Sequence, residues 1–115
     1  MKITIYQKPT CTTCKEVYKI LKEKNVDFNA VNYYIEPISK EKLKSLLKKM
    51  NMNATDILRT KELIYTELKI AEQNLNNDKL IELMSQYPDL IQRPIVETET
   101  KAILARPSKK IKEIL

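Results

Sequence analysis

Residues 2–33, KITIYQKPTCTTCKEVYKILKEKNVDFNAVNY, decide the fold of this 115-residue chain. Residues 2–6 are rich in β-branched and aromatic side chains, which predicts a short strand. Apolar side chains then recur at the spacing of one helix face, on Cys14, Val17, Tyr18 and Leu21. Residues 27–33 predict a second strand. A strand, a helix and a strand in succession form a βαβ unit, whose strands are parallel and whose crossover is right-handed.

Side chains at its two ends also mark this first helix. Thr10 follows Pro9 at the position expected for an N-cap, and Asn25 suits a left-handed C-cap in a chain without glycine. In the second strand we expect Phe28 and Ala30 to point inward.

The middle of the chain predicts a mostly helical insertion at about residues 39–88. The helices expected in it span residues 40–50 after the cap Ser39, a segment that starts at 55, residues 60–68, and residues 78–87 before Pro88. Each of the longer ones has its apolar residues on one face, which indicates that it packs against other elements.

The C-terminal third predicts a return to strands. Residues 94–97 and 101–105 form a β-hairpin pattern, and Ser108 is placed to cap a final helix. The whole order, β-α-β, helical insertion, β-β-α, predicts an α/β, thioredoxin-like fold with a four-stranded mixed sheet. We expect residues 1–115 to form a single domain that contains the insertion.

Composition narrows the possible chemistry, because the chain has no Gly, His or Trp. Without His there is no His general base, no Ser-His-Asp or Cys-His arrangement and no His metal ligand. Without Gly, P-loops and GxGxxG loops are excluded, because both need the backbone to approach phosphate closely.

The charge pattern and the N-terminus bear on partners and location. The net charge is +6, but most of it is lysine interspersed with glutamate, which is typical of solvated helix faces. No basic run is interleaved with aromatic residues, so we expect no nucleic-acid partner. No signal-peptide pattern or membrane-length apolar run is visible, so we expect a cytoplasmic protein without a membrane partner.

The motif Cys11-Thr-Thr-Cys14 stands where the first strand gives way to the first helix. Backbone N–H groups and the positive end of the helix dipole would stabilise a Cys11 thiolate, so we expect a pKa below the free value of about 8.5. Cys14 lies one turn deeper, on the apolar face. In a reducing compartment this order predicts an exposed nucleophile and a shielded resolving thiol.

Three other interpretations of the cysteines stay open. Cys14 also fills a core position, and both thiols could be inert. Half of a zinc site is a further alternative, but the chain has no other Cys and no His to complete it, so we expect no metal.

The three arginines, Arg59, Arg93 and Arg106, stand out in a lysine-rich chain because a guanidinium offers a planar fork of donors. Arg93 and Arg106 each precede a proline, which favours extended backbone. In the predicted fold Arg93 should lie near Cys11, with Arg106 close by and Arg59 folded over the same spot. Such a cluster would bind a tetrahedral oxyanion such as phosphate, arsenate or sulfate, whereas ordinary surface arginines are the alternative.

Four segments together resemble the arsenate reductase (ArsC) family, which includes the Spx-type regulators. They are Tyr6-x-x-Pro9-x-Cys11, Ile57-Leu58-Arg59, residues 90–96 with the sequence LIQRPIV, and Ala105-Arg106-Pro107. The resemblance covers essentially the whole chain. It implies a thioredoxin-like fold, with a cis peptide bond before Pro94.

The resemblance also implies a function. In the reductases a cysteine at the position of Cys11 attacks arsenate, and arginines matching Arg59, Arg93 and Arg106 hold the oxyanion and the adduct. Glutathione and glutaredoxin then reduce the adduct to arsenite, without a bound cofactor. Thiolate attack of this kind needs no His base, in agreement with the composition.

Cys14 keeps two alternatives open. Glutaredoxin-dependent reductases commonly have no Cys at that position, so thioredoxin is a second candidate donor. The CxxC motif is more usual in Spx-type regulators, so this chain could bind RNA polymerase under the control of a Cys11–Cys14 disulfide. Against this alternative, those regulators usually lack an Arg-Pro pair at the position of Arg106-Pro107 and carry a functional glycine. A general thiol-disulfide oxidoreductase is the other alternative.

Overall fold

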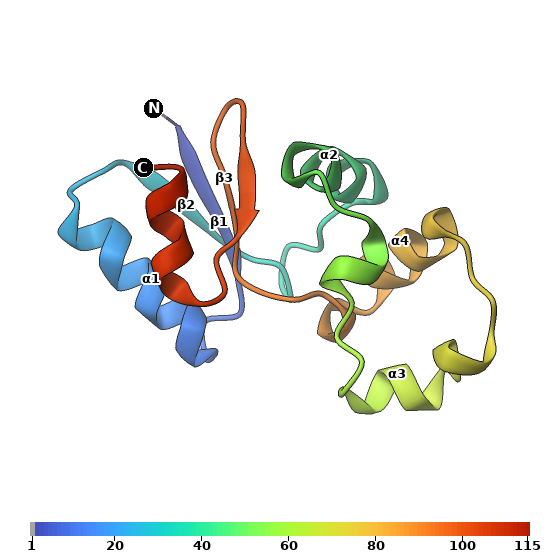
Figure 1. Cartoon of the computed structure of the whole chain (residues 1–115). Coiled ribbons are helices and arrows are strands. Elements are labelled where there is room, and N and C mark those ends of the chain that lie inside the picture. The colour runs from blue at the N-terminus through green and yellow to red at the C-terminus, as the bar shows by residue number, and fades with distance from the viewer. Residues whose placement is uncertain (1) are drawn as a thin grey trace. The chain divides into compact units, whose positions relative to one another are not determined.

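The computed structural model describes residues 2–115 and divides them into two compact units. The first unit combines the two ends of the chain, up to Glu36 and from Arg93 onward, and the second is Pro37–Gln92. Strands and helices follow the expected order, and the predicted α/β, thioredoxin-like class with a four-stranded mixed sheet is confirmed (Figure 1). That the whole chain forms a single domain with an insertion at about 39–88 stays a prediction.

The sheet of the first unit is built on β1 (Ile3–Gln7). This strand pairs in parallel with β2 (Phe28–Asn32) and antiparallel with β3 (Ile95–Glu97), and β4 (Ala102–Leu104) adds to β3, so the strand order is β2-β1-β3-β4. Helix α1 (Thr12–Glu23) connects the two parallel strands. This is the βαβ unit that the sequence predicts.

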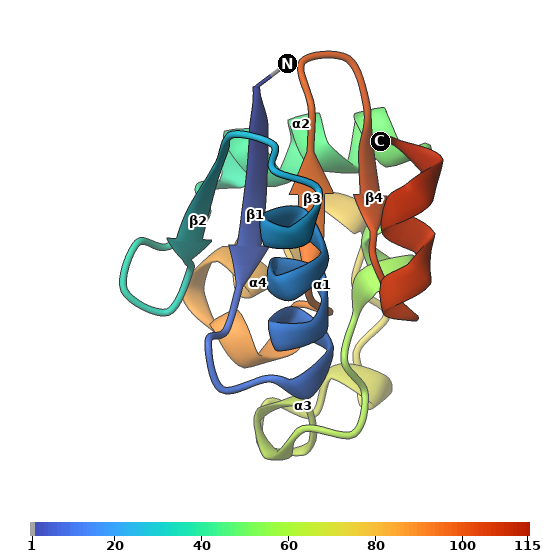
Figure 2. The ribbon, with the colours of Figure 1, turned by 90° about the vertical axis from the view of Figure 1, so that its left-hand side faces the viewer.

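One face of the sheet is covered by α1 and by the 3-10 helix η4 (Ser108–Glu113), as Figure 2 shows. The fully or nearly fully buried residues of this layer are Ile3, Ile5, Val17, Leu21, Val96, Ala105, Ile111 and Ile114. Ile3 and Ile5 of β1 lie in one buried cluster with Val17 and Leu21 of α1, so the two elements are held against each other. That packing fixes the loop between them, which carries Cys11.

Replacing Leu21 with alanine should lower the free energy of unfolding by about 3 kcal/mol, because it leaves a cavity in a close-packed core. Leu21 is completely buried in this layer. Lys19→Ala, on the exposed face of the same helix, is the matched control and should change stability by less than about 0.5 kcal/mol. Urea unfolding followed by circular dichroism measures both. Equal effects of the two substitutions would contradict this account of the core.

Four details of the first unit differ from the sequence-based expectation. Tyr18 is exposed, and the final helix is the 3-10 helix η4, which begins at Ser108 with Pro107, not Ser108, at its N-cap position. Cys11, and not Thr10, is the N-cap of α1, because its sulfur accepts a hydrogen bond from the N–H of Cys14 at 3.4 Å. Ala30 is exposed, since β2 is an edge strand. The left-handed Asn25 (φ 55°) that follows α1 agrees with the prediction.

The second unit is mainly helical. Helices α2 (Lys40–Met50) and α4 (Asn77–Gln86) pack against each other, and their buried residues are Leu43, Leu46, Leu47, Leu80, Ile81 and Met84. Ser39 caps α2 as predicted, with its Oγ accepting from the N–H of Lys42 at 3.1 Å. Shorter elements complete the unit, namely the 3-10 helices η1 (Ala54–Ile57), η2 (Ile70–Glu72) and η3 (Pro88–Leu90), and α3 (Leu63–Glu67).

The expected helix from residue 55 is only the 3-10 turn η1, because the chain next pairs with residues 90–92. The N–H of Gln92 donates to the carbonyl of Ile57, and the N–H of Arg59 donates to the carbonyl of Leu90, both at 2.8 Å. This pairing places Arg59 beside Gln92. Within residues 2–115, every helix is too short or too polar to cross a membrane.

Candidate active site

Cys11 lies in the loop that follows β1, at the start of α1. Its N–H donates to the carbonyl of Lys8 at 2.9 Å, and its sulfur accepts from the N–H of Cys14. The first turn of α1 contains no acidic residue, so no carboxylate there opposes the positive end of the helix dipole. The Cys11 side chain is only half-buried. A sulfur at this position is both stabilised as an anion and reachable from solvent.

The two thiols of the motif have opposite environments. Cys14 is completely buried and contacts Cys11, and neither forms a disulfide. Burial and the neighbouring Cys11 sulfur raise the pKa of Cys14 to about 12. Burial alone would also raise the pKa of Cys11, but hydrogen bonds from the Cys14 thiol and N–H and the charge and hydrogen bond of Arg93 outweigh it, so the pKa of Cys11 is lowered. Cys11 is therefore the better nucleophile of the pair at neutral pH.

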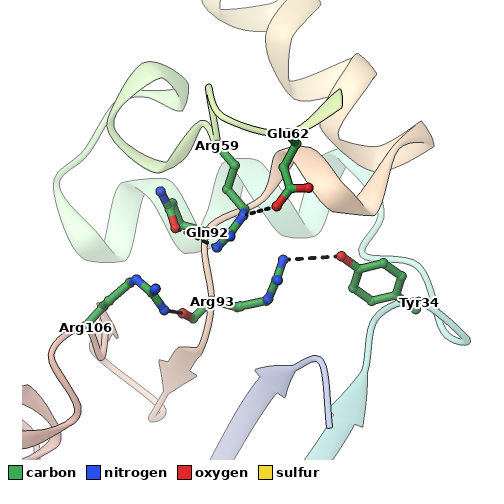
Figure 3. A network of polar contacts seen from close by, with 6 residues as sticks. All are labelled: Tyr34, Arg59, Glu62, Gln92, Arg93 and Arg106. Atoms are coloured by element: carbon green, nitrogen blue, oxygen red, sulfur yellow. Dashed lines mark hydrogen bonds and ion pairs between the residues drawn. The ribbon is translucent and has the colours of Figure 1, made fainter. Parts of the chain in front are cut away.

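Arg93 faces Cys11 from the start of the strand segment that follows the second unit. Its side chain is nearly buried, at 8% exposure, and its Nη1 donates to the hydroxyl of Tyr34 at 3.3 Å (Figure 3). Its Nε is buried and has no hydrogen-bond partner in residues 2–115. The peptide bond to Pro94 is cis.

The guanidinium of Arg93 stays charged in this position. Burial lowers its pKa, but electrostatic interaction with Tyr33 and Tyr34 and hydrogen bonds to Tyr33 and Cys11 outweigh that effect and raise the pKa above its ordinary value. The first unit therefore places a permanent positive charge, with one unsatisfied N–H, beside the thiol whose pKa is lowered. An unsatisfied buried donor costs free energy, which an acceptor bound at that place would recover.

Arg106 extends from the segment after β4 back toward Arg93. Its Nη1 donates to the main-chain carbonyl of Arg93 at 3.1 Å, and the peptide bond to Pro107 is also cis (Figure 3). The structure thus brings Arg93 and Arg106 together, and Arg93 together with Cys11.

Arg59 belongs to the second unit, where two side chains hold it. Its Nε donates to Oε1 of Glu62 and its Nη1 donates to Oε1 of Gln92, both at 3.0 Å (Figure 3). Gln92 directly precedes Arg93 in the chain. That Arg59 closes over the same spot as Cys11 stays a prediction.

Sequence analysis missed two residues that line the Cys11 loop in the first unit, Tyr34 and Lys8. Tyr34 stacks on Tyr33, with ring centroids 5.1 Å apart, and the ammonium of Lys8 lies 5.0 Å from the centroid of the Tyr34 ring. One signal was present, because Tyr34 follows β2 at the carboxyl end of the parallel strands, where α/β folds bind ligands. The described residues contain no group of three or more His, Cys, Asp or Glu placed to hold a metal.

Comparison with known proteins identifies the family. The model of the ArsC family matches residues 6–114. The uncharacterized protein YfgD of Escherichia coli (strain K12) is 36% identical over 115 residues, covering 99% of this chain and 97% of that protein. The arsenate reductase of the same organism is 34% identical over 113 residues, covering 98% of this chain and 80% of that enzyme.

A solved structure agrees with the sequence comparison. The arsenate reductase from Vibrio cholerae superposes with a TM-score of 0.94 at 32% identity, covering 100% of this chain and 98% of the other. The match includes the elements that carry Cys11, Arg93 and Arg106. This protein therefore belongs to the ArsC family and is an arsenate reductase-like oxidoreductase.

Proposed function

We propose that this protein is a thiol-dependent reductase that converts arsenate to arsenite, with the Cys11 thiolate as its nucleophile. The contact between Cys11 and Arg93 carries the proposal, because a thiol of lowered pKa lies beside a buried guanidinium that has an unsatisfied N–H. A tetrahedral oxyanion would supply the missing acceptor. Relatives named arsenate reductase support arsenate as that oxyanion.

The proposed reaction uses two thiols for each arsenate. The Cys11 thiolate attacks arsenic, a sulfur–arsenic bond forms, and one arsenate oxygen leaves as water after protonation. A second thiol then attacks the Cys11 sulfur, so that the sulfur–arsenic electron pair stays on arsenic and arsenite departs. One arsenate and two thiols thus give arsenite, one disulfide and water. Arg93 and Arg106, with Arg59 as a third member, would neutralise the oxyanion.

Cys14 is our proposed second thiol. Its pKa is raised by burial and also by the neighbouring Cys11 sulfur. Once Cys11 is bonded to arsenic it no longer carries a negative charge, and that part of the obstacle to Cys14 deprotonation disappears. The product is a Cys11–Cys14 disulfide, which thioredoxin or glutaredoxin would reduce. Such donors work in the reducing cytoplasm, where we place this protein.

Arsenate-dependent consumption of NADPH tests the function directly. One assay contains glutathione, glutathione reductase and glutaredoxin, and a second contains thioredoxin and thioredoxin reductase. We expect turnover in at least one of them, with arsenite as the product. No turnover in either would refute the proposal and leave only the family and the fold.

Replacing Cys14 with serine should separate the two donor routes. If Cys14 is the second thiol, the variant loses at least about 90% of its thioredoxin-supported turnover, because a serine hydroxyl cannot form the disulfide. Glutathione, which can itself attack the Cys11 sulfur, should keep turnover within about tenfold of the unmodified protein. Thr13→Ser, in the same turn of α1, is the control. Full activity of Cys14→Ser with thioredoxin would exclude Cys14 as the resolving thiol.

A second candidate is a redox-switched regulator that binds RNA polymerase. The observation that favours it is the contact between the free thiols of Cys11 and Cys14, which suits a reversible disulfide. This candidate predicts that polymerase is retained only by the oxidised protein, and that arsenate is not turned over. A general thiol-disulfide oxidoreductase would instead reduce protein disulfides with no effect of added oxyanion.

A further inference from the structure

Tyr34 makes an unusual pair of contacts with the two sides of the candidate site in the first unit. Its hydroxyl accepts a hydrogen bond from Nη1 of Arg93 at 3.3 Å, as Figure 3 shows. Its ring lies under the ammonium of Lys8, at 5.0 Å from the ring centroid. The carbonyl of Lys8 accepts the N–H of Cys11. One phenol side chain therefore contacts both the guanidinium and the loop that presents the thiol.

The ring of Tyr34 is held in position by its neighbours. It stacks on Tyr33, which is 1% exposed, at an interplanar angle of 28°. The N–H of Tyr34 donates to Oδ1 of Asn32 at 3.0 Å, which fixes the backbone just after β2. The hydroxyl is thus presented from the turn that directly follows β2.

We propose that Tyr34 is a positioning residue that fixes the guanidinium of Arg93 against Cys11. Arg93 reaches Cys11 through a long side chain whose guanidinium also interacts with Tyr33, and the hydroxyl of Tyr34 is the acceptor for its Nη1. A guanidinium only donates hydrogen bonds, and a phenol oxygen is a suitable acceptor. This inference rests on the proposed function only in taking arsenate as the oxyanion. The contact between Arg93 and Cys11 does not depend on that function.

Two effects follow from this role. A guanidinium held in one orientation stabilises the Cys11 thiolate more than a mobile one, and it meets the oxyanion without having to be ordered first. The hydroxyl is responsible for the hold on Arg93, whereas the ring is responsible for the contact with Lys8. The two contributions can be separated by substitution.

Tyr34→Phe removes the hydroxyl and keeps the ring. We expect the pH at which half of Cys11 is thiolate, measured by absorbance at 240 nm, to rise by about half a unit or more. We expect the KM for arsenate to rise about tenfold, with kcat changed less than about twofold at a pH where Cys11 is fully ionised. Tyr18→Phe removes a hydroxyl from a partly exposed tyrosine of α1 and should change neither quantity. Tyr34→Leu, which also removes the ring, should raise the KM further.

The outcomes distinguish this inference from the proposed function. If Tyr34→Phe leaves both the titration midpoint and the KM unchanged, or lowers either, the positioning role is refuted, because the phenol would then be neutral or would compete for Arg93. If the unmodified protein turns over no arsenate but the midpoint still rises, the positioning role stands and the proposed substrate is wrong. Far-UV circular dichroism and urea unfolding show whether each variant is folded. If Tyr34→Phe does not fold, Tyr34→Leu provides the test.

Discussion

Replacing Cys11 with serine should reduce arsenate turnover by at least about 10³-fold, to the level of the reaction without protein. Serine keeps the size of the side chain, but its hydroxyl stays protonated at neutral pH, and the chain has no His that could remove the proton. The NADPH-linked assay with the active donor measures the loss. Arsenate reduction by this protein would thus depend on one sulfur atom.

The reactivity of Cys11 should depend on pH, because only its thiolate form is a good nucleophile. Because the pKa of Cys11 is lowered in the folded protein, its thiolate persists below the pH at which an ordinary cysteine is protonated. Alkylation by iodoacetamide should therefore stay fast to a lower pH than for an ordinary cysteine, and fall as the pH drops below the lowered pKa. Cys14 should stay unmodified over the same range, because it is buried and its pKa is raised to about 12.

Two controls make the result specific. Thr12→Ser, next to Cys11 in the chain, should keep normal turnover, and unfolded protein should show both cysteines alkylated with an ordinary pH dependence. If Cys11→Ser turned over arsenate at more than about a hundredth of the normal rate, a residue other than Cys11 would be the nucleophile. Mass spectrometry of the alkylated protein identifies which cysteine has reacted.

The fold follows from local patterns, and these were visible in the sequence. The β-rich segment of residues 2–6 and the helical spacing through Leu21 give the βαβ unit. Cys14, Val17 and Leu21 are buried as that spacing predicts, whereas Tyr18, expected on the same helix face, is exposed. Ser39 and Asn25 mark helix ends for reasons of local hydrogen bonding and backbone conformation. Such features need no knowledge of distant parts of the chain.

The features that sequence analysis missed depend on distant contacts or on an uncommon chemical role. The helix expected from residue 55 ends after one 3-10 turn because its backbone pairs with residues 90–92, which no local period reveals. Cys11 acts as an N-cap although the residues preferred there are Ser, Thr, Asp and Asn. Tyr34 meets Arg93 only through the tertiary structure, 59 positions away in the chain.

Replacing Arg93 with alanine should raise the KM for arsenate by about 10²-fold or more and raise the pKa of Cys11. The substitution removes both the charge and the hydrogen bond that favour the thiolate, while the burial that opposes it remains. Absorbance at 240 nm against pH measures the pKa, and initial rates against arsenate concentration measure the KM. The two changes share one cause and should appear together.

Arg93→Lys separates charge from geometry. An ammonium keeps one positive charge, so the pKa of Cys11 should rise less than in the alanine variant. It has no planar fork, however, and cannot hold Tyr34 and the oxyanion at once, so the KM for arsenate should stay close to that of Arg93→Ala. Lys101→Ala, an exposed change before β4, controls for the loss of a positive charge. If both Arg93 variants kept the normal Cys11 pKa and the normal KM, the buried guanidinium would be only a structural group. A normal pKa with a raised KM would instead assign Arg93 to the oxyanion alone, and the helix N-terminus would then account for the thiolate.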